Sequence, residues 1–172
     1  GPCLTNAFAT QRQDITGLIA TDLGATTRLI ASVGTRGFAT TVQVGLEQNG
    51  ANGLYRATVP ASGCPADWAT ISRPDNGWPT ATSSGAPYPA NTLGRVDIAS
   101  APSDPNVIYA LIAQIPPVGT DRVILGVWRS ANGGDQWTQV QSGTIPGSGG
   151  QSWYNAGLLV HPTDPNVVIL SA

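Results

Sequence analysis

Apolar and polar residues alternate along short segments of this chain, and Gly, Pro, Asn and Asp separate these segments. Val127-Trp128-Arg129 and Trp137-Thr138-Gln139-Val140 are two such segments, and residues 130–136 join them. A period of two residues places alternate side chains on opposite faces of a strand, and an Asn-Gly turn between two such runs is typical of a β-hairpin. No helical periodicity of useful length is visible. The pattern therefore predicts an all-β protein built from antiparallel hairpins.

A longer pattern occurs twice: an apolar strand, an Asp-Pro-Asn turn and a second apolar strand. Residues 96–110 and 156–170 align without gaps, at an offset of 164 − 104 = 60 residues. Proline sets φ at such a turn, and the preceding Asp can accept a hydrogen bond from the backbone beyond it. A fainter copy, without the Asp-Pro-Asn turn, spans residues 15–33.

The hairpin repeats as well, because residues 53–56 match 126–129 and residues 68–71 match 137–140. Together the repeats predict four-stranded antiparallel blades of one β-propeller domain over residues 1–172. The chain holds about two and a half blades, which are assigned to residues 15–71, 94–140 and 156–172. Propellers typically contain about four to eight blades. We therefore expect the remaining blades to come from another chain, from a longer precursor or from residues outside the structure.

The hairpin turn carries the pattern Ser-x-Asp/Asn-x-Gly-x-x-Trp, whose four defining positions are Ser130, Asn132, Gly134 and Trp137. This pattern resembles the Asp-box, or BNR repeat, of sialidase-, sortilin- and xyloglucanase-type propellers. Residues 93–112 and 153–166 extend the resemblance to bacterial secreted, sortilin-like BNR proteins, which are often described as glycosyl hydrolases. The resemblance implies a structural role for the four Asp-box residues and a secreted or cell-surface location. It implies no single activity.

Charge and cysteine content narrow the function classes. The net charge is −2, and the eight basic residues are all Arg without forming a basic run, which argues against nucleic-acid binding. The sequence contains no stretch of 18 apolar residues, so it predicts no membrane-spanning helix. Cys3 and Cys64 are the only cysteines, and in a Gly- and Ser-rich β-protein they predict one disulfide. The alternative is two independent buried thiols.

Few residues offer catalytic chemistry. The chain lacks the sialidase Arg-Ile-Pro motif, and Glu47 is its sole Glu. Inverting glycosidases use two carboxylates about 6.5–9.5 Å apart, and Asp97 on a predicted inner strand is the one candidate for such a pair. The alternative is that Arg95 or backbone amides satisfy Asp97. His161 is the sole His, so we expect no metal site and no cofactor.

Four long connections are predicted on the face opposite the tight hairpin turns: residues 34–52, 72–93, 113–122 and 141–155. Long loops on a rigid scaffold are where binding residues concentrate. Aromatic rings beside a few polar groups suit sugars or peptides. The alternative is that these aromatics only pin the loops to the blades. The candidate ligand-binding residues are Trp78, Tyr88, Arg95, Trp153 and Tyr154.

Two functions remain open at the level of sequence. In the first, the chain is a fragment or subunit of an extracellular BNR/sortilin-like propeller that serves as a binding or structural module for a glycan, a peptide or a partner protein. In the second, it is part of a glycoside hydrolase whose catalytic residues lie mostly outside this chain.

Overall fold

The computed structural model describes residues 14–34, 53–79, 93–114, 124–142, 145 and 155–171. These residues form strands joined by turns, and the expected all-β, antiparallel architecture is confirmed. The elements are β1 (Asp14–Asp22), β2 (Thr27–Gly34), β3 (Gly53–Thr58), β4 (Ala69–Thr70), the 3-10 helix η1 (Pro74–Asn76), β5 (Leu93–Ala101), β6 (Asp104–Gln114), β7 (Ile124–Ser130), β8 (Thr138–Ser142), β9 (Gly157–Val160) and β10 (Val168–Ser171).

The strands form three separate antiparallel sheets, in which spatial order follows chain order. The first sheet is β1-β2-β3-β4, the second is β5-β6-β7-β8, and the third pairs β9 with β10. Short turns join neighbouring strands within each β1-β2, β5-β6, β7-β8 and β9-β10 pair, as the turn residues predict.

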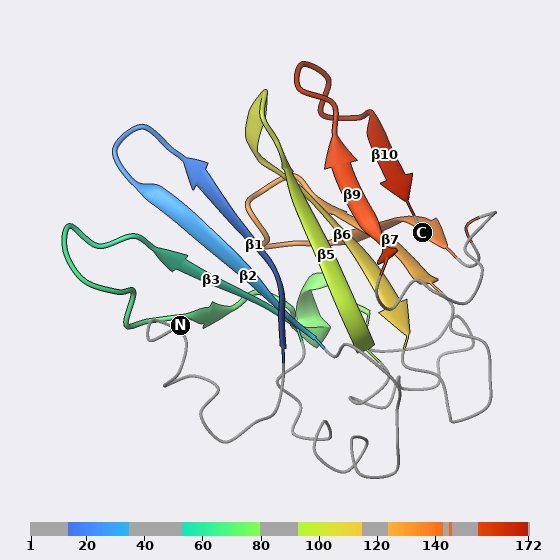
Figure 1. Cartoon of the computed structure of the whole chain (residues 1–172), viewed down its shortest axis with the longest axis horizontal. Coiled ribbons are helices and arrows are strands. Elements are labelled where there is room, and N and C mark those ends of the chain that lie inside the picture. The colour runs from blue at the N-terminus through green and yellow to red at the C-terminus, as the bar shows by residue number, and fades with distance from the viewer. Residues whose placement is uncertain are drawn as a thin grey trace, which may run out of the picture.

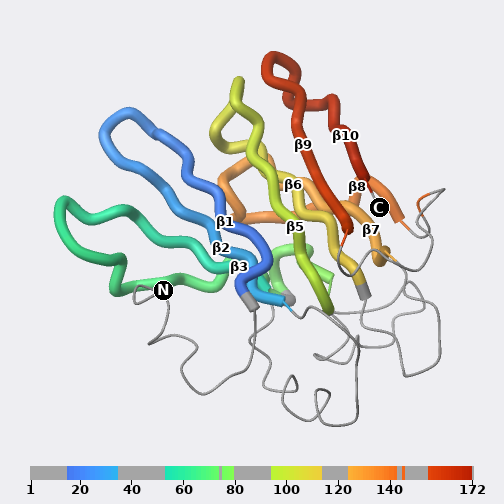
Figure 2. Tube along the Cα trace, viewed as in Figure 1, coloured from blue at the N-terminus to red at the C-terminus, as the bar shows by residue number. Residues whose placement is uncertain are grey.

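The three sheets lie side by side in chain order (Figure 1), and the tube view shows the same order (Figure 2). Their first strands lie next to one another, since β1 contacts β5 and β5 contacts β9. A side-chain bond joins the first two of these strands: the Thr16 hydroxyl donates to the Val96 carbonyl at 2.7 Å. The first strands of the three sheets therefore form one row, β1, β5 and β9.

Apolar side chains fill the spaces between sheets. Ile30, Leu54 and Ile71 of the first sheet's chain segment pack with Val96 and Ile98 of β5 in one cluster. A second cluster joins β6 and β7 to β9 and β10. Because the second sheet is covered on both faces, residues 107–113 of β6 are all buried and read as a continuous apolar run rather than an alternation.

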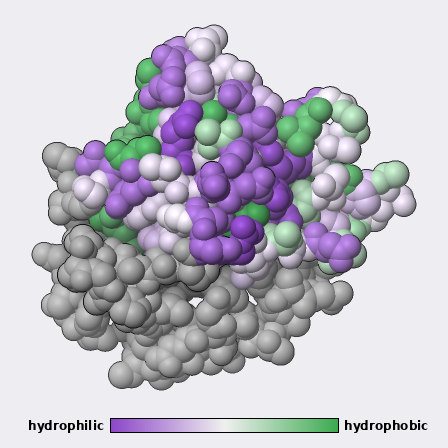
Figure 3. Space-filling view, turned by 180° about the vertical axis from the view of Figure 1, so that it is seen from behind, coloured by the Kyte–Doolittle hydropathy of each residue, from purple (hydrophilic) through white to green (hydrophobic). Residues whose placement is uncertain are grey.

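The outer sheets keep large apolar side chains in solvent. Leu159 of β9 and Ile169 of β10 face each other across the pair and are 66% and 60% exposed. Leu18 of β1, in the first sheet, is 57% exposed. Figure 3 shows the reverse side, where polar residues cover the middle and apolar residues gather in patches around it.

Candidate functional site

The turn between β7 and β8, which carries the Asp-box-like pattern and keeps that label, is held by its own side chains. The Ser130 hydroxyl accepts the Gly134 N–H at 2.9 Å and donates to Asn132 Oδ1 at 2.9 Å. Asn132 Oδ1 also accepts the Gln136 N–H at 2.9 Å. Gly133 and Gly134 have φ values of 71° and 99°, a region that favours glycine. These hydrogen bonds stabilise the turn that leads into Trp137.

Trp137 fastens the turn to the neighbouring sheet. Its indole N–H donates to the Ile71 carbonyl at 2.9 Å, and its backbone N–H donates to the Asn76 carbonyl at 2.7 Å. Ile71, directly after β4, is only 1% exposed. The Asp-box of the second sheet therefore covers the end of the first sheet.

Two arginines of the first sheet add further contacts to the second sheet. We call this contact between the first and second sheets the first interface. Arg56 Nη1 donates to the Gly133 carbonyl at 2.9 Å and lies 2.8 Å from an Asp135 carboxylate oxygen. The Arg28 guanidinium donates to the Pro105 carbonyl at the start of β6, directly after the β5–β6 turn. Burial lowers the pKa of Arg28, the neighbouring charge of Arg56 lowers it further, and Asp135 opposes both. The arginines thus bind the two turns that the second sheet presents.

A second interface, between the second and third sheets, repeats part of this arrangement. The Tyr109 hydroxyl donates to the Pro165 carbonyl at 2.8 Å, and Arg129 Nε donates to the Tyr109 hydroxyl at 3.2 Å. The Arg129 guanidinium carbon lies 5.9 Å from the centre of the Tyr109 ring. Pro165 lies 165 − 105 = 60 residues after Pro105. In both interfaces, the proline carbonyl of one Asp-Pro-Asn turn accepts a hydrogen bond from the preceding sheet.

The Asp-Pro-Asn turns themselves have the geometry that the repeat predicts. The Asp104 carboxylate accepts the Asn106 N–H at 3.0 Å, and the Asp164 carboxylate accepts the Asn166 N–H at 2.9 Å. Each aspartate therefore closes a tight turn. In each turn, this bond holds the backbone carbonyl of the proline, which lies between the Asp and the Asn, where the neighbouring sheet can reach it.

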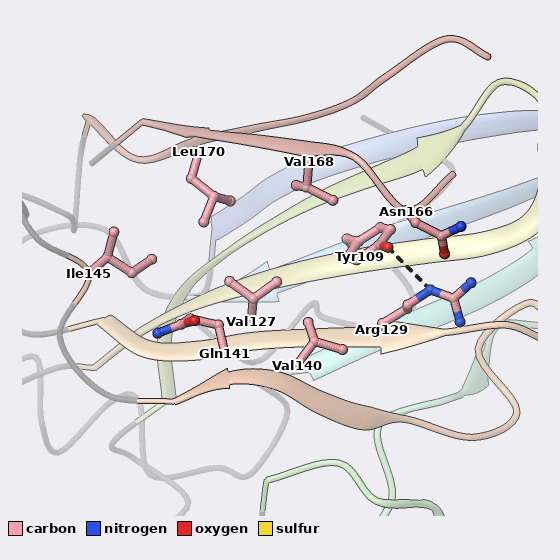
Figure 4. Close-up of a pocket in the computed structure, with 9 residues that line it drawn as sticks. All are labelled: Tyr109, Val127, Arg129, Val140, Gln141, Ile145, Asn166, Val168 and Leu170. Atoms are coloured by element: carbon pink, nitrogen blue, oxygen red, sulfur yellow. Dashed lines mark hydrogen bonds between the residues drawn. The ribbon is translucent and has the colours of Figure 1, made fainter. Parts of the chain in front are cut away.

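A groove opens beside the second interface. It is a cavity of about 540 Å³ between β10 and the β7–β8 hairpin. Figure 4 shows Val168 and Leu170 extending from β10 toward Val127 and Val140, with Arg129 and Tyr109 at one end. Val140 is 50% exposed in this groove. The lining residues are Tyr109, Val127, Arg129, Val140, Gln141, Ile145, Asn166, Val168 and Leu170.

A smaller cavity of about 410 Å³ lies at the outer edge of the first interface. Arg28, Arg56 and Asp67 contribute its charged groups. Both arginines already bind backbone carbonyls or Asp135 of the second sheet. This cavity therefore belongs to the first interface.

The predicted ligand-binding residue Trp78 does not lie at the surface. It is 4% exposed, and its ring packs edge-to-face against Trp137 with centroids 5.2 Å apart. The prediction of a ligand contact for Trp78 is therefore corrected to a core packing role, which is the alternative considered for these aromatics. Tyr88, Trp153 and Tyr154 lie outside the described residues, as does most of the predicted long-loop face.

Arg95 and Asp97 form a pair on β5. Arg95 Nε and Nη2 each lie 2.8 Å from one of the two Asp97 oxygens, and the two side chains are 19% and 13% exposed. Arg95 also donates to the Ala156 carbonyl at 3.3 Å. Both carboxylate oxygens are thus held by one guanidinium, the alternative that the sequence left open. Asp97 is therefore a paired acid, and its partner Arg95 joins β5 to Ala156, the residue before β9.

Other predicted features fall partly outside the described residues. Cys64 lies exposed in the β3–β4 loop, and no described cysteine is a free thiol. Cys3 lies outside the described residues, so the Cys3–Cys64 disulfide stays a prediction.

Within the described ranges, His, Cys, Asp and Glu form no group of three that could hold a metal ion. No helix in that part of the chain is long and apolar enough to cross a membrane.

Comparisons with protein-family models, with curated proteins and with solved structures give no significant match to this chain. A function can therefore be inferred only from the geometry of the two interfaces and the groove.

The residues predicted from the sequence to be functional do not include Arg28, Tyr109 or Arg129, which make the interface contacts. A signal for Arg129 was present, because the hairpin repeat aligns it with Arg56. Tyr109 and Arg129 are also cross-strand partners in the β6–β7 register. Arg28 had no such signal, since the weaker first copy lacks the turn that anchors the alignment.

Proposed function

We propose that this chain is part of an extracellular β-propeller of the BNR, sortilin-like kind, in which the three sheets are successive blades and the assembled propeller serves as a binding or structural module for a glycan, a peptide or a partner protein. The observation that carries this proposal is the repeated use of the Asp-Pro-Asn turn. Pro105 accepts a hydrogen bond from Arg28, and Pro165 accepts one from Tyr109, 60 residues later.

A repeated contact between successive sheets supports a repeated rotation from one sheet to the next. The adjacency of β1 with β5 and of β5 with β9 has the same meaning, since first strands that stay in contact place the sheets around a common axis. Further blades then pack on the two outer faces, which carry the exposed residues Leu18 at one end and Leu159 at the other.

No described residue favours the hydrolase alternative. Asp97, its weak catalytic candidate, has both carboxylate oxygens on Arg95. A general base needs an oxygen within hydrogen-bond reach of the proton that it removes.

The proposal is tested on the two outer faces. We expect the purified chain to self-associate in sedimentation velocity and to bind an apolar dye. Leu18→Ser and Leu159→Ser should each reduce both signals without lowering the thermal midpoint. Val59→Ser is the matched control, since Val59 is 40% exposed but lies in the β3–β4 loop. A compact monomer that binds no dye would contradict the proposal.

The binding role is tested separately with panels of soluble glycans and peptides. We expect retention of at least one class without release of cleaved product. Turnover of a glycan that persists through purification would favour the hydrolase instead.

A further inference from the structure

The first and second sheets pair corresponding residues of their strands, but the residues of their last strands are covered to different extents. In the first sheet Ile30 pairs with Arg56, and Arg56 pairs with Ala69. In the second sheet Tyr109 pairs with Arg129, and Arg129 pairs with Thr138. Counting two residues onward along the chain, Ile71 of the first sheet corresponds to Val140 of the second. Ile71 donates its N–H to the Leu54 carbonyl, whereas a bulge in β8 at Val140 pairs Val127 with Gln141. Leu54 corresponds to Val127, and Arg56 to Arg129, along β3 and β7.

The corresponding residues have different exposure. Ile71 is 1% exposed beneath the Asp-box hairpin of the second sheet, whereas Val140 is 50% exposed in the groove. The side chain of Ile71 meets Gly134 of the Asp-box so closely that a Cβ added to Gly134 would lie 2.5 Å from Ile71 Cδ1. Val140 is thus the surface on which a second such hairpin would rest.

The two arginines differ in the same way. Arg56 binds the turn carbonyl of Gly133 and the carboxylate of Asp135. Arg129, half-buried at the end of the groove, donates to the Tyr109 hydroxyl and has no carboxylate partner in the described part of the chain. A buried or half-buried guanidinium favours a carboxylate or carbonyl acceptor.

The edge of the third sheet has room for further strands. Among the described residues, β10 pairs with β9 and with no other strand. In the second sheet the corresponding strand, β6, pairs with both β5 and β7. An unpaired strand edge presents N–H and C=O groups that an added strand satisfies.

We propose that the groove between β10 and β7–β8 binds a partner β-hairpin with the chemistry of this chain's own Asp-box: a Trp ring, a turn carbonyl and a turn carboxylate. One strand of the hairpin pairs with β10, and the Trp ring packs on Val140 and donates its indole N–H to the Val140 carbonyl. Arg129 binds the turn carbonyl and the carboxylate. This inference rests on the proposed arrangement of repeated sheets.

The probe is a cyclised, fluorescein-labelled peptide of residues 126–142, whose ends face each other because Gly126 pairs with Ser142. Fluorescence anisotropy with the full chain should show saturable binding. Trp137→Ala in the peptide should weaken binding about tenfold or more, since a buried aromatic anchor dominates such contacts. Asp135→Asn in the peptide should weaken it about threefold, as for a partly exposed ion pair.

Variants of the chain locate the binding site. Val140→Asp and Arg129→Gln should each weaken binding about tenfold. Val140→Asp changes an exposed side chain, so its thermal midpoint should stay close to that of the unchanged chain. Leu159→Ser is the control and should bind the peptide normally, since Leu159 does not line the groove.

Three outcomes would overturn the inference: absence of saturable binding, binding that Val140→Asp and Arg129→Gln leave unchanged, or self-association of the chain that Val140→Asp abolishes. The third would mean that a second copy occupies the groove. Failure of the peptide test while Leu18→Ser and Leu159→Ser still reduce self-association would reject the groove assignment but keep the proposed propeller. A compact monomer without exposed apolar faces would reject the propeller itself.

Discussion

The Trp78 ring packs edge-to-face against the Trp137 ring, with centroids 5.2 Å apart and planes at 75°. Trp78 follows the helix η1 of the first sheet's segment, and Trp137 directly precedes β8, the last strand of the second sheet. The pair therefore joins two sheets through ring contact rather than through backbone pairing. Edge-to-face aromatic pairs contribute about 0.5–1.5 kcal/mol beyond their buried area. This contact explains why Trp78 is unavailable to a ligand.

Replacing Trp137 with Phe should destabilise the chain by removing one hydrogen bond. The Ile71 carbonyl, which accepts the indole N–H at 2.9 Å, would keep only its second donor, Asn76 Nδ2 at 2.8 Å. The expected loss in the free energy of unfolding is about 0.5–1.5 kcal/mol, the net contribution of one hydrogen bond, measured by urea denaturation. Trp68→Phe is the matched control, because the buried Trp68 indole nitrogen has no hydrogen-bond partner. Equal losses in the two variants would show that the indole bond does not matter.

Gly134→Ala should cost more than Gly24→Ala, although both glycines have positive φ values, 99° and 83°. Both variants incur backbone strain of about 1–2 kcal/mol. At Gly134 the added Cβ also meets Ile71 Cδ1 at 2.5 Å, whereas at Gly24 it meets nothing within 4 Å. Overpacking adds about 1–3 kcal/mol at Gly134. Thermal melts of both variants check the difference, and similar midpoints would argue against tight docking of the Asp-box.

Asp97→Asn should destabilise the chain strongly, because Arg95 would keep its charge in a site where it is 19% exposed. Removing one partner of a buried ion pair costs about 3–5 kcal/mol, and the residual exposure places this variant near the lower value. Asp75→Asn is the control, since the Arg73–Asp75 pair has side chains 46% and 75% exposed. Exposed pairs contribute about 0–1 kcal/mol. Chemical denaturation compares the two, and a neutral Asp97→Asn would refute the structural role.

Tyr55 should make stability depend on alkaline pH, because burial raises its pKa above the usual value of about 10. The folded state then holds the phenolic proton more tightly than the unfolded state. This stabilisation is complete below pH about 10 and is lost as the pH rises through the folded pKa. Urea denaturation at successive pH values should show a steeper alkaline loss for the unchanged chain than for Tyr55→Phe. Parallel pH profiles would be incompatible with the raised pKa.

A disulfide between Cys3 and Cys64 should tie the N-terminal segment to the loop between β3 and β4. Closing a loop of this size stabilises a domain by roughly 2–4 kcal/mol. Alkylation and mass measurement before and after reduction test it. Two alkylated thiols without reductant would rule the bridge out.

Local sequence was sufficient to predict the elements of this protein. Alternation over residues 127–140, the two Asp-Pro-Asn turns and the Asp-box turn predicted hairpins, and the structure contains them. Such features depend on φ preferences, alternation and short-range hydrogen bonds, which a few neighbouring residues decide. The same reasoning left open whether Asp97 was satisfied by Arg95, a residue two positions away on the same strand.

Only the tertiary structure decided which face each side chain meets. Trp78 was predicted in a binding loop but is buried against Trp137, because the second sheet's hairpin folds over the end of the first sheet. Arg28 reaches Pro105 from 77 residues away, and Tyr109 reaches Pro165 from 56 residues away. Such pairs depend on how whole sheets pack. The sequence determined the strands and turns of this protein, and packing between the sheets determined its interfaces and the open groove beside β10.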